Sequence, residues 1–129
     1  MGRVLLDTHV LLWALLAPER LSERVRDLVR DRRTTVLVSA ASAWEIATKH
    51  RLGKLPDAGD VVGGYGDHLR RLGVDELPVT SAHALTAGSF AIAHRDPFDR
   101  VLAAQALHEG VSLATSDPAF AVFPCTVVW

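Results

Sequence analysis

The chain has 129 residues, of which 49% are hydrophobic and 22% are charged, and its formal net charge is −1 at pH 7. This length fits one domain over residues 1–129, with enough apolar material for a layered fold. The single cysteine, Cys125, excludes an internal disulfide framework and a cysteine-rich zinc site, and it fits a reducing compartment. The balanced charge excludes a generally basic nucleic-acid-binding surface, so any such contact must be local. We expect a cytoplasmic protein.

The first predicted strand covers residues 4–6, and an apolar helix over residues 10–16 follows it. Asp7 lies between them, where an Asp commonly caps a helix by accepting backbone N–H bonds. The apolar stretch 10–17 is too short to span a bilayer, and the polar residues Asp7 and His9 stand directly before it. We therefore expect neither a membrane helix nor a signal peptide.

Short apolar runs alternate with helical patterns along the rest of the chain. Further strands are predicted over 36–38, 74–77, 112–114 and 126–128, and further helices over 22–32, 40–52, 60–72, 81–93 and 97–109. Strands that alternate with helices predict βαβ units, so we expect an α/β fold whose mostly parallel sheet is covered on both faces. In such sheets, functional sites form beyond the carboxyl ends of the strands.

Four acidic residues interrupt apolar segments, where burial of a charge is unfavourable: Asp7, Glu45, Asp99 and Asp117. A buried carboxylate without a partner is costly, so each one requires a cation, a helix cap or a strong donor. Hard divalent ions such as Mg²⁺ and Mn²⁺ prefer oxygen ligands and can activate a bound water for attack on phosphate. The four acids together therefore predict a metal site for phosphoester chemistry.

Most of these acids also have a purely structural interpretation. Asp7 and Asp117 each follow a predicted strand and fit helix caps, and Pro118 suits a first helical position. Asp96 fits the cap of the helix over 97–109, and Asp99 stands where an acid can reach back to the cap N–H. Local structure alone accounts for these residues.

Glu45 is harder to explain locally, because its helix is apolar on both sides of it. An ion pair with Lys49, four residues on, is the structural alternative, and such a pair stabilises a helix by only about 0.2–0.5 kcal/mol. The cations Lys49, His50, Arg51 and Lys54 are predicted either to hold substrate phosphates or to favour the dipole at the helix end.

Four motifs occur in a specific order along nearly the whole chain: Leu6-Asp7-Thr8, Ser39-x-x-Ser42-x-Trp44-Glu45-Ile46-Ala47, His94-x-Asp96-Pro97-Phe98-Asp99-Arg100 and Leu113-x-Thr115-x-Asp117. In this combination the chain resembles a PIN domain of the VapC toxin type. The resemblance implies a three-layer α/β/α PIN-like domain with a mostly parallel central sheet. It also implies an acidic pocket that binds Mg²⁺, for which Mn²⁺ can substitute.

The resemblance further implies an activity and its partners. The chain would be a metal-dependent endoribonuclease, the toxin of a toxin–antitoxin pair, which hydrolyses RNA with a metal-activated water and leaves a 5′-phosphate and a 3′-hydroxyl. Asp7, Glu45, Asp99 and Asp117 occupy the family's four acidic positions, and Asp96 is either a fifth ligand or only a cap. The implied partners are RNA, a VapB-like antitoxin and a second copy of the chain in a homodimer.

Residues beside these motifs have predicted supporting roles. Those expected to orient carboxylates or to contact substrate are Thr8, Thr115, Lys49 and Arg100. The six histidines form no HxxxH or HxH pair, and only His9 and His94 stand beside the acidic positions. Trp13 and Trp44 are predicted either to be core aromatics or to line a groove for an antitoxin helix.

Other interpretations use similar residues. A phosphotransfer receiver or a phosphatase also has an Asp at a strand end, but Asp7-Thr8-His9 lacks an Asp-x-Asp motif, and Glu45 would have no role. A flap-like DNA nuclease needs more DNA-binding segments than 129 residues accommodate. A catalytically silent PIN module that binds RNA or a protein is expected to lose one of the acids, whereas all four are present.

Overall fold

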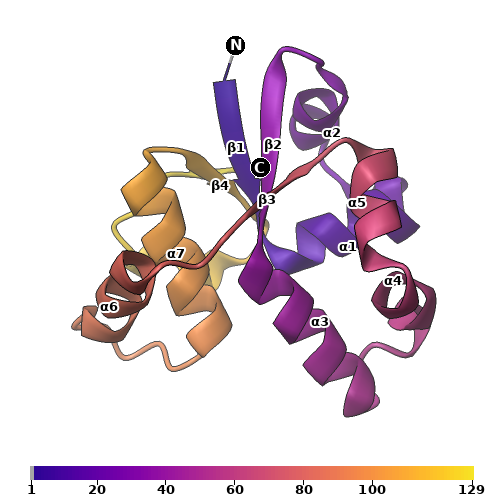
Figure 1. Ribbon diagram of the computed structural model, residues 1–129. Helices are drawn as coiled ribbons and strands as arrows, with labels where there is room; N and C mark the ends of the chain where they lie inside the picture. The colour runs from indigo at the N-terminus through magenta and orange to yellow at the C-terminus, as the bar shows by residue number, and fades with distance from the viewer. Residues whose placement is uncertain (1) are drawn as a thin grey trace.

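The computed structural model describes residues 2–129, and a five-stranded sheet forms its centre, with every strand pair parallel. The strands lie in the order β3-β2-β1-β4-β5 (Figure 1). Their bounds are β1 Gly2–Leu6, β2 Thr34–Ser39, β3 Asp75–Leu77, β4 Ser112–Ala114 and β5 Val127–Val128. The predicted α/β fold with a parallel sheet is confirmed.

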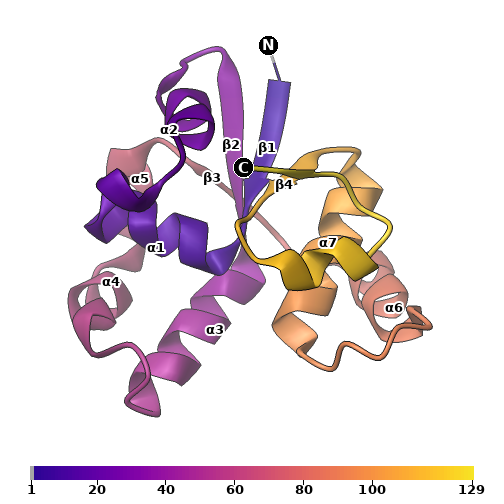
Figure 2. The same ribbon diagram turned by 180° about the vertical axis from the view of Figure 1, so that it is seen from behind.

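Helices flank the sheet on both sides (Figures 1 and 2). One side carries α1 (Thr8–Leu16), α2 (Glu23–Arg30), α4 (Gly59–Gly63) and α5 (Tyr65–Leu72), and the other carries α6 (Ser81–Ser89) and α7 (Pro97–Glu109). Helix α3 (Ala40–Arg51) projects from the carboxyl end of β2 between these two groups. Three short 3₁₀ turns each begin with a proline: η1 (Pro18–Arg20), η2 (Pro56–Ala58) and η3 (Pro118–Val122).

The central strands build one core on each face of the sheet, because successive side chains point to opposite sides. Val4 and Leu6 of β1 belong to the core that packs against α1, α2 and α5. Leu5, the residue between them, belongs to the other core together with Leu113 of β4 and Leu102 of α7. Burial on both faces explains why these strands read as continuous apolar runs without alternation.

The prediction of one helix over 60–72 is wrong, because the segment forms two helices, α4 and α5, that are separated at Gly64. Gly64 has φ −133° and ψ 36°, which is outside the helical region. Gly63 and Gly64 stand side by side, and each glycine inside a helix costs about 1 kcal/mol relative to alanine. The chain therefore turns where the helix is weakest.

The helix predicted over 81–93 ends at Ser89, four residues early. Arg100, on the following helix, explains the early end, because its guanidinium donates to carbonyl oxygens of the segment beyond Ser89. Those carbonyls belong to Phe90, Ile92 and His94, at 2.7–3.0 Å. This long-range contact replaces the hydrogen bonds that a continued helix would make.

The remaining elements begin and end within two residues of their predicted positions, and the helix 97–109 and the strand 112–114 match at both ends. No helix within residues 2–129 is long and apolar enough to cross a membrane.

Candidate metal site and adjoining groove

The acidic residues gather at the carboxyl edge of the sheet, where the strand order changes direction. The chain passes from β1 to β2 and β3 on one side, whereas β4 lies on the other side of β1. The crevice between β1 and β4 is therefore the topological switch point, the usual ligand position in open α/β sheets. Asp7 directly follows β1, and Asp117 stands three residues after β4. The sheet thus brings together two residues that are far apart in sequence.

A pocket of about 100 Å³ opens at this point, and it contains all five acids singled out from the sequence. Its lining residues are Asp7, Thr8, His9, Glu45, Lys49, Asp96, Asp99, Asp117 and Phe120. They come from α1, α3, α7 and η3, or from the residues that directly precede those elements.

Asp7 is both a helix cap and a pocket residue. It is 4% exposed, and its Oδ1 accepts the Val10 N–H over 2.7 Å at the start of α1. Burial raises the pKa of Asp7, hydrogen bonds from Thr115 and Val10 oppose that change, and the charge of Glu45 adds to it. The structural and functional interpretations of Asp7 are therefore compatible.

Glu45 is the most deeply buried acid of the pocket, at 3% exposed. Its Oε2 forms an ion pair with Lys49 Nζ, one turn further along α3. Its Oε1 is buried and has no hydrogen-bond partner among the described residues. An unpaired buried acceptor costs about 1–3 kcal/mol, so this oxygen is suited to a donor or a cation that enters the pocket.

Asp99 is half-buried in the first turn of α7, and its Oδ2 accepts a hydrogen bond from His94 Nε2 over 2.8 Å. Its pKa is raised to about 6, chiefly by burial; the bond from His94 lowers it, and the charges of Asp96 and Glu45 raise it further. The sequence predicted that the Asp99 carboxylate would accept the backbone N–H of Asp96; in the structure it accepts a bond from His94 instead. The pocket therefore contains carboxylates that destabilise one another's ionised forms.

Asp96 and Asp117 lie at the rim and act as caps, as their local sequences predict. Asp96 Oδ1 accepts the N–H groups of Phe98 and Asp99 at 2.9 and 3.3 Å. Asp117 is exposed, and its Oδ1 accepts the Ala119 N–H over 2.9 Å. Each cap bond involves one carboxylate oxygen, and both side chains still line the pocket.

Hydroxyl groups join the elements around the acids. Thr8 Oγ1 and Ser42 Oγ share a buried hydrogen bond of 2.9 Å, which ties α1 to α3. Thr115 Oγ1 accepts the N–H of Asp117 over 3.0 Å and also bonds to Asp7. Ser42 had no predicted role of its own, although its position three residues before Glu45 places it on the same helix face.

Two residues with predicted roles lie elsewhere. Arg100 does not line the pocket, because its guanidinium is bonded to backbone carbonyls, including that of Ala87 at 2.8 Å. Trp44 is not a core residue: it is 65% exposed and packs edge-to-face on Phe98, with ring centroids 4.9 Å apart. Of the four cations after Glu45, only Lys49 lines the acidic pocket.

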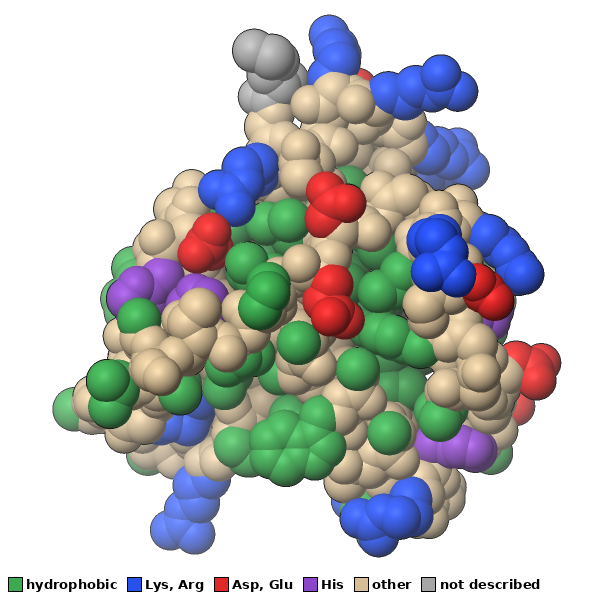
Figure 3. Space-filling model, in the orientation of Figure 1, with side chains coloured by type: hydrophobic (Ala, Val, Ile, Leu, Met, Phe, Trp, Pro, Cys, Tyr) green, Lys and Arg blue, Asp and Glu red, His purple; other side chains and the backbone are tan. Residues whose placement is uncertain are grey.

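One group of exposed arginines lies away from the acids. Arg30, Arg32 and Arg33 are exposed at the turn from α2 to β2. Lys and Arg side chains gather over this turn at the top of Figure 3, near the amino ends of the strands. This cationic surface lies at the opposite end of the sheet from the acidic pocket, so it does not contribute to the pocket's charge balance.

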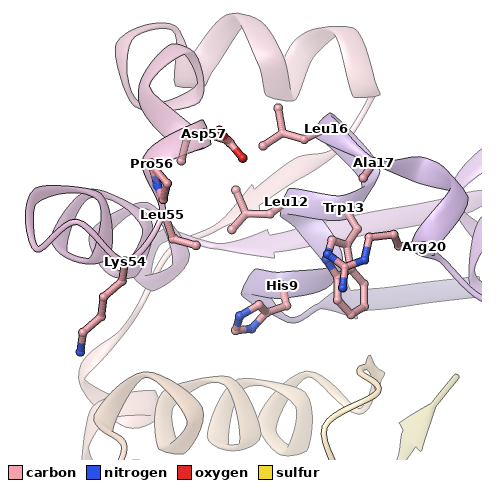
Figure 4. Close-up of a pocket in the computed structure, with 11 residues that line it drawn as sticks. His9, Leu12, Trp13, Leu16, Ala17, Arg20, Lys54, Leu55, Pro56 and Asp57 are labelled. Atoms are coloured by element: carbon pink, nitrogen blue, oxygen red, sulfur yellow. The ribbon is translucent and has the colours of Figure 1, made fainter.

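A larger groove of about 530 Å³ adjoins the acidic pocket, between α1 and the η2 turn (Figure 4). It is lined by the apolar side chains Leu12, Trp13, Leu16, Leu55 and Pro56, together with His9, Ala17, Arg20, Lys54, Asp57 and Ala58. The guanidinium of Arg20 lies 4.8 Å from the centre of the Trp13 ring. His9 lines both cavities, so the groove and the acidic pocket lie on either side of this residue.

The donor set fits a hard divalent ion, although the present side-chain positions do not enclose one. Within residues 2–129, no three His, Cys, Asp or Glu side chains are arranged to hold a metal together. The ammonium of Lys49 instead occupies the position beside Glu45. The carboxylate oxygens, and in particular the unpaired Oε1 of Glu45, are nevertheless the ligand type that Mg²⁺ and Mn²⁺ prefer.

Solved structures with the same fold include VapBC2 and FitAcB. VapBC2 from Rickettsia felis, bound to a DNA fragment from its promoter, superposes with a TM-score of 0.66 at 12% identity, over 98% of this chain and 97% of that one. FitAcB from Neisseria gonorrhoeae superposes with a TM-score of 0.62 at 25% identity, over 98% and 96%. The first likeness, at so low an identity, concerns the fold alone.

The sequence comparisons identify the family. Ribonuclease VapC16 from Mycobacterium tuberculosis (strain ATCC 25618 / H37Rv) is 46% identical over 68 residues, which are 53% of this chain and 48% of that protein. The match thus spans about half the length of this curated relative. A model of the PIN domain matches residues 4–124. The chain therefore belongs to the PIN domain family.

Proposed function

We propose that this PIN domain is a Mg²⁺-dependent endoribonuclease, with Mn²⁺ as a substitute, and the toxin of a toxin–antitoxin pair. The observation that carries the proposal is the gathering of Asp7, Glu45 and Asp99 in one pocket, where a buried Glu45 oxygen lacks a partner. The sequence similarity to Ribonuclease VapC16 supports RNA as the substrate.

In this proposal Asp7, Glu45, Asp99 and Asp117 hold the metal, and Asp96 is either a fifth ligand or only a cap. A bound divalent ion supplies an activated water and neutralises charge on the phosphodiester. Hydrolysis places the water oxygen on the phosphorus and a proton on the departing 3′-oxygen, which leaves a 5′-phosphate and a 3′-hydroxyl. The protein prepares this site by fixing its carboxylates: the Val10 N–H holds Asp7, and His94 holds Asp99.

The groove beside the acids is the proposed binding site of the antitoxin. Its apolar floor around Trp13 suits an amphipathic segment, and its cationic side chains, Arg20 and Lys54, suit acidic residues at the segment's edge. Because His9 joins the groove to the acidic pocket, a bound segment would also restrict access of RNA.

We also propose a homodimer and action in the cytoplasm. The family relation supports both proposals, and the single Cys125 suits a reducing compartment. Light scattering of the purified chain tests the dimer.

A catalytically silent PIN module, which binds RNA or a protein, is the second candidate. One observation favours it: the acids do not enclose a metal as they now lie, and Lys49 is paired with Glu45. The two candidates differ in whether the pocket cleaves RNA when a divalent ion is supplied.

The test uses the chain purified free of partners and end-labelled RNAs in Mg²⁺, Mn²⁺ or EDTA. Asp7→Asn removes a charge from the pocket but retains a side chain that can cap α1. Asp60→Asn is the matched control, because Asp60 is exposed on α4 outside the pocket. We expect metal-dependent cuts with 5′-phosphates from the wild type and from Asp60→Asn, and none from Asp7→Asn. Metal binding without cleavage of any RNA would favour the silent module.

A further inference from the structure

We infer that Lys49 is a built-in competitor of the metal ion: its ammonium group neutralises Glu45 in the metal-free protein and leaves Glu45 when a divalent ion binds. This inference rests on the proposed function, because it assigns Lys49 a part in loading the same pocket.

The Glu45–Lys49 pair differs from an ordinary ion pair on a helix surface. Both residues lie on α3 at a spacing of four, but the Glu45 side chain is 3% exposed and the Lys49 side chain is 27% exposed. A surface pair can separate into water with little effect on the fold. Here, removal of the ammonium leaves a buried carboxylate without a counter-ion. The metal-free fold therefore depends on Lys49.

Lys49 faces carboxylates from two helices. Burial lowers its pKa, but the hydrogen bond and charge of Glu45, followed by the charges of Asp96, which caps α7, and of Asp99 in α7, raise it overall. Two of these carboxylates, Glu45 and Asp99, are the groups proposed to hold the metal. A dication and an ammonium would thus compete for the same oxygens in a pocket of about 100 Å³.

The Lys49 ammonium leaves one carboxylate oxygen of the pocket without a hydrogen-bond partner. It pairs with Oε2 of Glu45, whereas Oε1 of the same carboxylate is buried without a partner. A divalent ion carries more charge than the ammonium and accepts several oxygen ligands at once, so it can take over this carboxylate. The partly exposed lysine stem is flexible and gives the ammonium a way out toward solvent.

Two effects follow from this competition. The ammonium weakens metal binding, because the ion must displace it, and it keeps the protein folded when metal is scarce. After displacement, the ammonium stays within one side-chain length of the pocket, where it can meet a substrate phosphate.

Lys49→Met tests the inference, because it retains much of the aliphatic stem and removes the charge. Lys54→Met is the control, since Lys54 lies beyond the end of α3 and lines the other groove. Calorimetric titration with Mn²⁺ should show about three- to tenfold tighter binding in Lys49→Met than in wild type or Lys54→Met. In EDTA, Lys49→Met should melt several degrees below the other two.

The outcomes separate the two proposals. If the wild type binds Mn²⁺ and Lys49→Met binds it equally or more weakly, the competition is refuted and the proposed metal site stands. If neither the wild type nor Lys49→Met binds Mn²⁺, the proposed metal site fails, and the competition fails with it.

A second measurement needs no folded Lys49→Met. In a proton–nitrogen correlation spectrum of lysine ammonium groups, the Lys49 signal of the wild type should be protected in EDTA and should be lost or shifted when Mg²⁺ is added. Its assignment comes from Lys49→Arg, which retains the charge. A Lys49 signal that stays unchanged at saturating Mg²⁺ would overturn the inference.

Discussion

Helix α7 carries an acidic side chain near each end, and the two environments are opposite. Near its amino end, Asp99 is crowded by Asp96 and Glu45, and its pKa is raised to about 6, chiefly by burial. At its carboxyl end, Glu109 accepts a bond from Arg3 over 3.1 Å, and this bond is the main reason that its pKa is lowered. An acid paired with a cation of its own chain stabilises the fold, whereas an acid crowded by other acids costs stability and marks a ligand site.

The largest expected difference between the two ends is in catalysis. Asp99→Asn should lower the rate of metal-dependent RNA cleavage by more than about 100-fold, because it removes a carboxylate from the proposed metal site. Glu109→Gln should retain the wild-type rate within about threefold, since Glu109 lies outside the pocket. Initial rates on one end-labelled RNA check both values. Equal losses of cleavage rate in the two variants would contradict different roles for Asp99 and Glu109.

Variants at the two ends of α7 should also differ in how much a bound metal raises their Tm. At a Mn²⁺ concentration of 100 times its Kd, linkage stabilises the fold by about 2.7 kcal/mol, which raises the Tm of a domain of this size by about 10 °C. Glu109→Gln should show the same rise, and Asp99→Asn a much smaller one. Scanning calorimetry with and without Mn²⁺ measures the rise; a full rise in Asp99→Asn would argue that the ion binds elsewhere.

Without metal, the pH dependence of stability should reveal the cost of Asp99. Its folded pKa of about 6 lies above the ordinary Asp pKa of 3.8, so the folded state binds the proton more tightly than the unfolded state does. The stabilisation of the fold by the proton on Asp99 is fully present below the unfolded pKa and is lost as the pH rises through about 6. At pH 7, Asp99→Asn should be more stable than wild type by on the order of 1 kcal/mol, after allowance for partial exposure. Urea unfolding in EDTA should show this advantage shrinking at pH 4.5.

The smallest effect is expected at Glu109. Its pKa is lowered by Arg3, so its contribution is present above the unfolded pKa of 4.5 and is lost as the pH falls through the folded value. Glu109→Gln should therefore destabilise the fold at pH 7 by no more than about 1 kcal/mol, because the ion pair is partly exposed. Repeating the urea unfolding at high salt should reduce this difference; a larger loss that is insensitive to salt would point to packing instead.

The contrast at α7 also shows what the sequence can and cannot reveal. The position of Asp7 and Asp117 at one edge of the sheet was predictable, because each follows a strand and the carboxyl ends of parallel strands share that edge. The caps at Asp96 and Asp117 follow from local patterns and are confirmed. These features depend on neighbours along the chain.

The side-chain partners that lie far apart in the sequence were not predictable, because they depend on tertiary distances. Arg3 and Glu109 are 106 residues apart, and nothing in the local sequence joins them. For Lys49, the i, i+4 spacing predicted the ion pair with Glu45, which is confirmed, and the sequence left open a role at the helix end or on a phosphate; only the fold shows Lys49 inside the acidic pocket. Likewise, the bonds from Arg100 that end α6 early cross between two helices.

The most direct test of the acidic pocket is a crystal structure of the chain with Mn²⁺, in which anomalous scattering locates the ion. We predict an anomalous peak in contact with carboxylate oxygens of Asp7, Glu45 and Asp99, with the Lys49 ammonium no longer bonded to Glu45. A structure at saturating Mn²⁺ in which the ion binds only outside this pocket, with Lys49 still paired to Glu45, would contradict the assignment of a metal site.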